Sequence, residues 1–440
     1  EQVKTAFAPP RGAERAWKRG ELAADIKQRE HSIEQLTTVT SGLGSPRPVA
    51  RRQLLIGGLA AGGVVVAGGG GTAAWWLNSR KAEENLFAYP PAADTPEADF
   101  LSEDDGDYTI GEPPKALWKR ERVVGLDSPA VLPVRDVVVF GGVDGGLVAH
   151  NVVDGKKRWA AEEVRRTGRF LSLSDRLIAA VDDRGTLRTY VASTGEPKWT
   201  VDAGADALLA ADAKAVYLVT KDGELRSVRR SDAKVRWTAP VPRPYRKKKL
   251  LPPGIAAGGR LVVSTDAGDV LAVDTEDGSK AWEIREQSNG PVRPARWRDT
   301  VYINGDSLTA RALTDGKEQW TKKERDPWDR HETWGPPIAY PTAVYSSHGT
   351  TPRCVNPYNG SEVWDSRAGS MIGSPLAVQG RTLWSIDEET FNQVNTVETD
   401  EGFTVWNYPL PEAKRPRWLV GGGNRVFVMN DHALYALPVA

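Results

Sequence analysis

Short runs of alternating hydrophobic and polar residues fill most of the chain, and Gly-containing turns separate them. Val137–Phe140, Leu261–Ser264 and Val301–Ile303 are rich in β-branched residues, and Leu147–Ala149 is followed by a turn at Asp154-Gly155. Runs this short, bounded by Asp-Gly or Thr-Gly, are typical of β-strands joined in hairpins. The sequence from residue 113 onward therefore predicts an all-β domain.

Seven fifteen-residue segments share this pattern, and each of them ends in Trp. Gly stands four residues before the Trp in six segments, and Ala233 takes that place in the third. Trp118 precedes them at the same spacing, and the interval averages about 41 residues over Trp118, Trp159, Trp199, Trp237, Trp282, Trp320, Trp364 and Trp406. A fixed period of this length predicts a propeller or a solenoid. Four short strands in each unit favour the propeller blade.

The C-terminal unit predicts how the ring closes. It ends in His432–Leu437 and stops before any Trp, whereas Lys115–Arg122 carries Trp118 but has no preceding strands of its own. Pairing these two segments removes the exposed sheet edges that an open ring would leave. We therefore predict an eight-bladed β-propeller over residues 113–440, in which Leu117–Lys119 pairs with Leu434–Leu437.

The residues before the propeller predict a membrane attachment. Residues 1–52 form a basic arm with one amphipathic helix expected at Glu21–Leu36, and residues 78–112 form an acidic linker that contains Pro. Between them, residues 53–77 carry no charge, and the 24 residues of Leu54–Leu77 are enough to cross a bilayer. We interpret residues 53–77 as a single transmembrane or signal-anchor helix, with the N-terminus in the cytoplasm and the propeller outside it. The pair Arg51-Arg52 is also typical of a twin-arginine export signal, which would be cleaved.

Composition excludes several classes of function. The 58 Lys and Arg residues balance 58 Asp and Glu residues, which argues against a nucleic-acid partner. Cys354 is the single cysteine, so the chain forms neither an intrachain disulfide nor a Cys-based zinc site. The five His residues lack metal-ligand spacing, and neither a nucleophile elbow nor a Walker loop occurs. We therefore predict no catalytic residue, metal or cofactor. The acidic residues that precede hairpin glycines are interpreted as turn residues: Asp144, Asp182, Asp183, Asp222 and Asp266.

The fifteen-residue pattern, G-x-L-x-A-x-D-x-x-x-G-x-x-x-W, resembles the quinoprotein or PQQ-like repeat. The segment GDVLAVDTEDGSKAW, which ends at Trp282, is closest to it. The resemblance implies that each of the eight Trp residues docks between neighbouring blades. Dehydrogenases of that family hold pyrroloquinoline quinone over Ca²⁺, often beside a disulfide of adjacent Cys residues. With one Cys, this sequence departs from that pattern, and a quinone enzyme is the least favoured interpretation.

Two segments outside the repeat are candidate binding loops. Val241–Leu250 carries five basic residues, among them Arg246, Lys247, Lys248 and Lys249, which would attract an anionic partner or lipid headgroups. The alternative is that these charges are only solvated. Asp326–Pro337 carries a second group of candidates for partner contact, Trp328, His331 and Trp334. Trp is common among binding anchors, although a Trp here also suits core packing.

A second resemblance concerns the N-terminal arm. Ala16–Leu36, followed by the Arg pair and the apolar span, is similar to the last helix and juxtamembrane tail of bacterial Ser/Thr kinases. Some of those kinases carry an extracytoplasmic PQQ-like propeller as a sensor, but the kinase catalytic motifs are absent from this sequence. The favoured hypothesis is a non-enzymatic, membrane-anchored receptor or scaffold for a protein, peptide or cell-wall ligand. An assembly factor resembling the propeller of the outer-membrane-protein insertion machinery is the alternative.

Overall fold

The computed structural model describes residues 86–97, 112–129, 131–323, 333–387, 393–413 and 418–439. All of them belong to one compact unit, Asn85–Ala440. Within these ranges no helix is long and apolar enough to cross a bilayer. The helix expected at Glu21–Leu36 and the apolar span at residues 53–77 lie outside the described residues.

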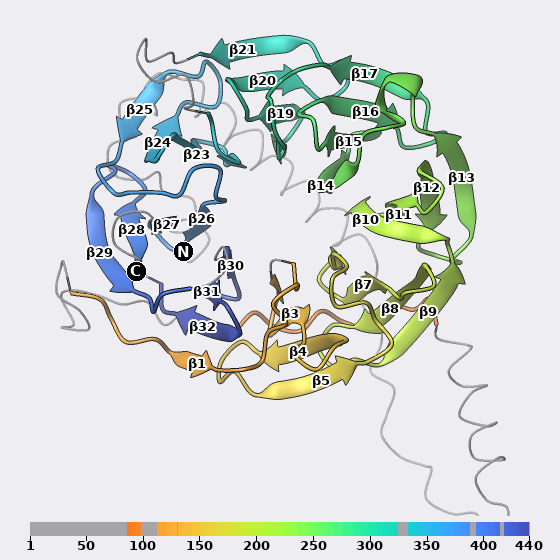
Figure 1. Cartoon of the computed structure of the whole chain (residues 1–440), viewed down its shortest axis with the longest axis horizontal. Helices are drawn as coiled ribbons and strands as arrows, with labels where there is room; N and C mark the ends of the chain where they lie inside the picture. The colour runs from red at the N-terminus through yellow and green to blue at the C-terminus, as the bar shows by residue number, and fades with distance from the viewer. Residues whose placement is uncertain are drawn as a thin grey trace, which may run out of the picture. The chain divides into compact units, whose positions relative to one another are not determined.

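Eight four-stranded antiparallel sheets form a ring, which confirms the predicted eight-bladed all-β propeller (Figure 1). The innermost strands are β2 (Leu132–Val134), β6 (Leu171–Leu173), β10 (Ala205–Ala211), β14 (Leu250–Ala257), β18 (Ala295–Trp297), β22 (Ile338–Ala339), β26 (Ala377–Gln379) and β30 (Trp418–Gly422). The second strands are β3 (Val137–Gly141), β7 (Leu177–Val181), β11 (Ala215–Thr220), β15 (Arg260–Thr265), β19 (Thr300–Ile303), β23 (Val344–His348), β27 (Thr382–Asp387) and β31 (Arg425–Asn430).

The outer half of each blade completes the sheet. The third strands are β4 (Leu147–Asn151), β8 (Thr186–Val191), β12 (Glu224–Arg229), β16 (Val270–Asp274), β20 (Leu308–Ala312), β24 (Thr351–Val355), β28 (Gln393–Glu398) and β32 (Ala433–Leu437). The outermost strands are β5 (Lys157–Ala161), β9 (Pro197–Asp202), β13 (Val235–Pro240), β17 (Lys280–Ile284), β21 (Glu318–Lys322), β25 (Glu362–Asp365), β29 (Thr404–Pro409) and β1 (Trp118–Arg120). One 3₁₀ helix, η1, covers Arg243–Tyr245.

The burial of each strand follows from its position in the blade. Every residue of β3 and of β7 is buried, because a second strand lies between two neighbouring blades and packs on both faces. In β5 the exposed and buried residues alternate around Trp159, because only one face of an outermost strand meets a neighbour. The hydrophobic core is therefore a ring of layers between blades.

The two ends of the chain meet in one blade, as the sequence predicts. Strand β1 pairs antiparallel with β32, with Trp118 opposite Ala436 and Arg120 opposite Leu434. The backbone amide of Leu117 adds a hydrogen bond to the Ala436 carbonyl oxygen at 2.9 Å. This N-terminal strand is the outermost strand of the last blade and closes the ring.

At six blade junctions a Trp docks on the neighbouring blade. The indole Nε1 of Trp282, for example, donates a 2.9 Å hydrogen bond to the Leu313 carbonyl oxygen of the next blade. Gly316 lies against the same ring with a φ of +72°, and a Cβ there would lie 2.8 Å from the indole. The repeated Gly is therefore required both by the left-handed backbone and by the Trp ring that packs on it. The same donation to the next blade is made by Trp118, Trp159, Trp237, Trp320 and Trp364.

The other two junctions differ for identifiable reasons. Trp199 packs in one cluster with Ala233, the residue that replaces the repeated Gly, and Ala233 has a φ of +55°. Trp406 lies on the blade before the closing blade. In the closing blade, β32 and β1 are not consecutive in the chain, so no hairpin turn joins its third and outermost strands. The turn that accepts the Trp N–H at the other junctions is therefore missing there. Within the described residues, neither indole N–H has a hydrogen-bond partner.

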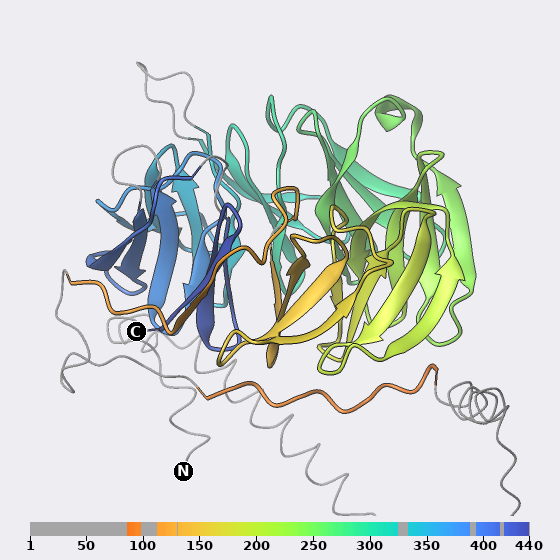
Figure 2. The ribbon, with the colours of Figure 1, turned by 60° about the horizontal axis from the view of Figure 1, so that its bottom comes forward.

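The ring has two faces, which we name by their loops. The connection face carries the links from each outermost strand to the next innermost strand, together with the links between second and third strands. The turn face carries the hairpins between first and second strands and between third and fourth strands. Residues 86–97 run along the turn face as an extended segment, seen beneath the ring in Figure 2.

This segment is tied to several blades. Tyr89 Oη accepts a 2.8 Å hydrogen bond from Arg230 Nε, and the Arg230 guanidinium lies 5.0 Å from the Tyr89 ring centre. Further along, the Pro96 carbonyl oxygen accepts a 2.7 Å hydrogen bond from Asn424 Nδ2 of the closing blade. The turn face is therefore partly covered by the chain itself.

Candidate functional site: a basic pocket on the connection face

The basic segment Val241–Leu250 links β13 to β14 on the connection face. Val241, Tyr245 and Leu250 are buried, whereas Arg246, Lys247 and Lys249 are exposed. Pro242 and Pro244 favour the tight turn of η1, which the Tyr245 amide closes by donating to the Pro242 carbonyl oxygen at 2.9 Å. The apolar residues thus anchor the loop, and the cations project from it.

Tyr245 fixes the loop to the rest of its blade. Its side chain is 1% exposed, and its hydroxyl donates a 2.8 Å hydrogen bond to Glu283 Oε2 on β17. Burial raises the pKa of Tyr245, and Glu283 raises it further, so the phenol keeps its proton and remains a donor. The Arg246 Nε group adds a 3.2 Å hydrogen bond to the Val241 carbonyl oxygen across the base of the loop.

Lys248 is neutralised within the protein. Its ammonium forms an ion pair with Asp269, whose side chain is almost fully buried. Burial opposes ionisation of Asp269, but hydrogen bonds from Lys248, the Glu286 amide and Thr265 outweigh it and lower the pKa of this carboxyl. Lys248 is therefore a structural cation, in contrast to the other basic residues of the loop.

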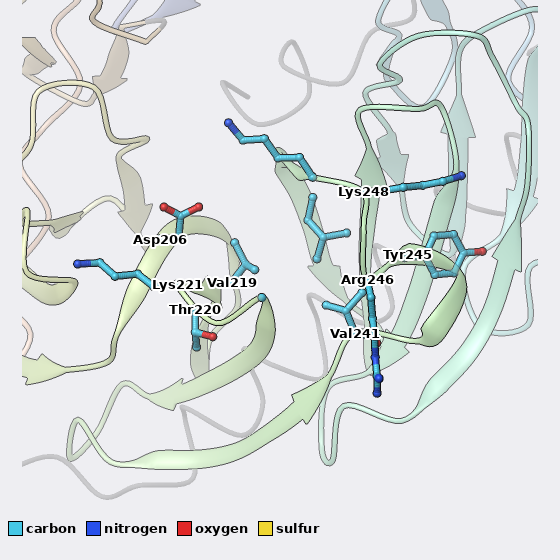
Figure 3. Close-up of a pocket in the computed structure, with 11 residues that line it drawn as sticks. Asp206, Val219, Thr220, Lys221, Val241, Tyr245, Arg246 and Lys248 are labelled. Carbon is cyan, nitrogen blue, oxygen red and sulfur yellow. The ribbon is translucent and has the colours of Figure 1, made fainter.

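The loop forms one wall of a pocket with a volume of about 140 Å³. The opposite wall comes from the preceding blade, and Figure 3 shows Asp206, Thr220 and Lys221 on that side, with the Lys221 side chain extending away from the loop. The lining residues include four cations and one acidic residue, Asp206. Asp206 already has a cation nearby, because its carboxylate lies 4.0 Å from Arg165 Nη1. The pocket therefore carries an excess of positive charge.

Such an arrangement suits an acidic side chain or another small anion. Arg presents several N–H donors to a carboxylate, and exposed Lys residues around it attract and orient an approaching negative surface. Exposed ion pairs add little affinity one by one, so the loop works as a recognition surface only when several cations act together. Arg246, Lys247 and Lys249 are the residues able to do this.

The second candidate loop gives a different result. Trp328 and His331 lie outside the described residues. Trp334 is 1% exposed, and its backbone amide donates a 2.8 Å hydrogen bond to the Gly305 carbonyl oxygen. Its ring lies 5.0 Å from that of His348. The sequence interpretation of Trp334 as a partner-binding anchor needs correction, because its indole is packed in the core and is not presented to a partner.

The described residues do not fit pyrroloquinoline quinone with Ca²⁺. Among them, no group of three or more His, Cys, Asp or Glu side chains is placed to hold a metal ion. Cys354 is buried, and burial raises the pKa of its thiol to about 12, so it stays protonated. Asp182 serves a turn, because its carboxylate accepts hydrogen bonds from the Arg184 and Thr186 amides at 3.0 and 2.9 Å.

Sequence reasoning found one wall of the pocket and missed the other. The basic run at residues 246–249 is visible as a departure from the repeat, whereas Thr220 and Lys221 belong to an ordinary hairpin link. Asp206 likewise opens a strand that has no unusual composition. Only the ring geometry places these residues against the basic loop, so no local signal could have identified them.

Comparisons with known proteins agree with this fold. A family model described as outer membrane protein assembly factor BamB matches residues 2–239, 110–321 and 246–345. The crystal structure of BamB from Moraxella catarrhalis is 17% identical, covers 61% of this chain and 84% of its own, and has a TM-score of 0.52. The computationally designed Ika8 protein is 12% identical, covers 74% of this chain and 98% of its own, and has a TM-score of 0.56.

Quinohemoprotein alcohol dehydrogenase ADHIIG from Pseudomonas putida HK5 is 12% identical, covers 76% of this chain and 73% of its own, and has a TM-score of 0.49. The comparison with curated proteins finds no match. At identities this low, the similarity to the Moraxella and designed structures shows the propeller fold alone.

Proposed function

Because the chain belongs to the family described as outer membrane protein assembly factor BamB, we propose that it is a non-enzymatic scaffold that binds a protein through its connection face. The observation that carries this proposal is the pocket beside Val241–Leu250, where Lys221, Arg246 and Lys249 outnumber the one acidic lining residue after Lys248 is paired with Asp269. The partner would present an acidic surface, with one carboxylate entering the pocket. A rigid ring suits such a role, because its loops are held in place by packed blades.

The two faces support the choice of the connection face. Residues 86–97 already occupy part of the turn face, with Tyr89 against Arg230 and Pro96 against Asn424. The connection face carries the longer and more varied links, which can differ in sequence without disturbing the Trp junctions. A partner would therefore find most of its specific contacts there.

We further propose that residues 53–77 anchor the chain in a membrane and that the propeller lies outside the cytoplasm. Support comes from the uncharged run Leu54–Leu77 and the basic residues before it. Carbonate extraction of membranes tests this proposal. An anchored chain stays in the pellet, whereas a chain cleaved near Trp75 is released as soluble protein.

Two settings are compatible with a scaffold of this kind. The resemblance of Ala16–Leu36 to a kinase juxtamembrane region favours a sensor domain joined to a Ser/Thr kinase. The family match favours an assembly factor for outer-membrane proteins. The coding sequence upstream of Glu1 distinguishes the two, because a kinase domain there supports the sensor and its absence supports the assembly factor.

The experiment that tests the scaffold function compares two triple variants of equal charge change. Arg246, Lys247 and Lys249 are changed to Glu in the first variant, and Lys156, Lys157 and Lys234 on the turn face are changed to Glu in the second. All six side chains belong to exposed residues, so both variants should fold. We expect the first variant to lose the proteins that co-purify with the wild-type chain and the second to retain them. Equal loss from both variants would refute the proposed face.

A further inference from the structure

Residues 86–97, which we call the strap, run along the turn face from the third blade (β10–β13) to the closing blade. The strap meets the third blade through Arg230, the first blade through Arg135 and the closing blade through Asn424. Figure 2 shows it passing beneath this part of the propeller. Its contacts are therefore made with side chains of several blades, as a bound peptide makes them with a protein surface.

Tyr89 is the anchor of the strap. Its aromatic ring packs on the hydrophobic layer between the second and third blades, which contains Leu173 and Val216. Its hydroxyl accepts the 2.8 Å hydrogen bond from Arg230 Nε, and the Arg230 guanidinium lies 5.0 Å from the ring centre. Tyr combines a large apolar area with a polar tip, so the propeller matches both parts of this side chain.

The propeller holds Arg230 in position to meet such a residue. Arg230 is 5% exposed, its Nη1 group donates to the Asp212 carbonyl oxygen, and its Nη2 group donates to Ser174 Oγ at 3.0 Å. The Nη groups are thus satisfied within the second and third blades, whereas the Nε group is satisfied by the strap. Because a buried donor without an acceptor is costly, this position requires an oxygen atom from a ligand.

The second half of the strap is held through its oxygen atoms. The donors are Arg135 Nη1 for Thr95 Oγ1 at 3.2 Å, Asn424 Nδ2 for the Pro96 carbonyl oxygen at 2.7 Å, and Arg425 Nη1 for the Glu97 carbonyl oxygen at 3.2 Å. In each of these hydrogen bonds, as in the bond to Tyr89, the propeller donates and the strap accepts. The surface is therefore complementary to a segment that presents hydrogen-bond acceptors.

This pattern of donors suits a segment that contains Pro. Three of the twelve strap residues are Pro90, Pro91 and Pro96. Pro has no N–H group and favours an extended backbone whose carbonyl oxygens are accessible. Surfaces that recognise such segments combine a site for an aromatic or Pro side chain with donors for the carbonyl oxygens, and this part of the turn face has both.

The donors are a local feature of the turn face and do not belong to the repeat. In the first blade, Arg135 and Asp136 form the hairpin between β2 and β3. In the fourth blade, the corresponding hairpin between β14 and β15 consists of Gly258 and Gly259, which have no side chains to donate. The strap thus follows the part of the face where donor side chains are present.

We propose that this part of the turn face is a peptide-binding surface for extended segments in which a Tyr precedes Pro residues, and that the strap occupies it in cis. The partner is a protein that presents a Tyr-Pro-Pro segment in an extended conformation. Such a partner has to compete with the strap, which the chain holds at a high effective concentration. The surface is separate from the basic pocket on the connection face, so it does not depend on the proposed scaffold function.

Binding of a labelled peptide in trans tests this surface. The peptide has the sequence of residues 86–97 with acetylated and amidated ends, and the full chain carries Tyr89→Ala, so that its own strap lacks the anchor. Fluorescence polarisation should show saturable binding to this chain. The wild-type chain should bind the peptide at least about tenfold more weakly, because its strap competes. Equal binding by the two chains, or no saturable binding to the Tyr89→Ala chain, would overturn the proposal.

Variants of the peptide make the test independent of the folding of the chain. In the peptide, Tyr89→Ala should weaken binding by about tenfold or more, because it removes a hydrogen bond to a charged group. Phe87→Ala is the matched control and should leave binding nearly unchanged, because Phe87 is an exposed aromatic residue of the same strap. If the two changes weaken binding equally, Tyr89 is not a specific anchor and the proposal is wrong.

Variants of the propeller locate the bound peptide. Arg230→Met, added to Tyr89→Ala, keeps the length of the side chain but removes its donors and should abolish binding. Lys234→Met, at an exposed position of the same turn, should leave binding unchanged. Peptide binding that survives Arg230→Met would place the peptide elsewhere. A wild-type dimer that Tyr89→Ala dissolves in sedimentation equilibrium would assign the strap to a second copy and overturn its occupation in cis.

Discussion

The turn face and the connection face are built from the same repeat but obey different constraints. On the turn face, five residues separate β4 from β5 and β8 from β9, and a Gly in each of these turns receives the Trp of the preceding blade. On the connection face, the links differ widely in length, from the short link at residues 203–204 to the long link at residues 323–337. Trp docking therefore fixes the turns, whereas the links are free to vary and to carry binding groups.

The strongest test of the ring removes the strand that closes it. Deletion of Lys115–Arg122 takes β1 away from β32 and exposes the edge of the last blade. We expect the loss of cooperative unfolding and a large fall in Tm, measured by circular dichroism. If the truncated chain unfolds as cooperatively and at the same temperature as the full chain, closure by β1 does not stabilise the ring.

The next test compares a regular Trp junction with an exceptional one. Trp282→Phe removes the hydrogen bond to the Leu313 carbonyl oxygen, whereas Trp199→Phe removes an N–H group that has no partner among the described residues. We expect Trp282→Phe to lower the free energy of unfolding by about 1–3 kcal/mol more than Trp199→Phe does. Denaturant titration measures both values. Equal losses would show that the indole hydrogen bond contributes little to the junction.

A smaller effect concerns the residue on which each Trp packs. Gly316→Ala places a Cβ against the Trp282 ring at a φ of +72°, so it should destabilise the chain. The opposite change, Ala233→Gly, relieves a left-handed Ala and should stabilise the chain by about 1 kcal/mol. Denaturant titration of both variants checks the opposite signs. A loss of stability in Ala233→Gly would contradict this explanation of the repeat.

The smallest effect lies on the connection face and depends on pH. The folded pKa of Asp269 is lower than its ordinary value of 3.8, so the stabilisation from its ionised form is present above that pH and is lost as the pH falls through the folded pKa. The difference in unfolding free energy between the wild-type chain and Asp269→Asn should therefore shrink in acid. Asp222→Asn, at an exposed link residue, is the control and should leave the pH profile unchanged. A constant difference for Asp269→Asn would contradict the ion pair with Lys248.

Much of the fold could be predicted from the sequence because the Trp period records packing. Trp118 without preceding strands and a last unit without Trp were enough to predict eight blades and their closure. Trp334 could not be interpreted in this way, because a Trp outside the repeat register looks the same whether it is buried or exposed. Lys221 and Asp206 gave no signal at all, since their proximity to Arg246 depends on how adjacent blades are placed in the ring.

Site-specific photocrosslinking in intact cells shows directly whether a partner binds the connection face. A photoreactive residue is placed at Lys247 in one chain and at Lys156 in another, so that each probe lies on a different face. Both positions are exposed, and substitution there should change the free energy of unfolding by no more than about 0.5 kcal/mol. We expect a discrete crosslinked protein from position 247 that is absent from position 156. Crosslinks from position 156 alone would contradict it.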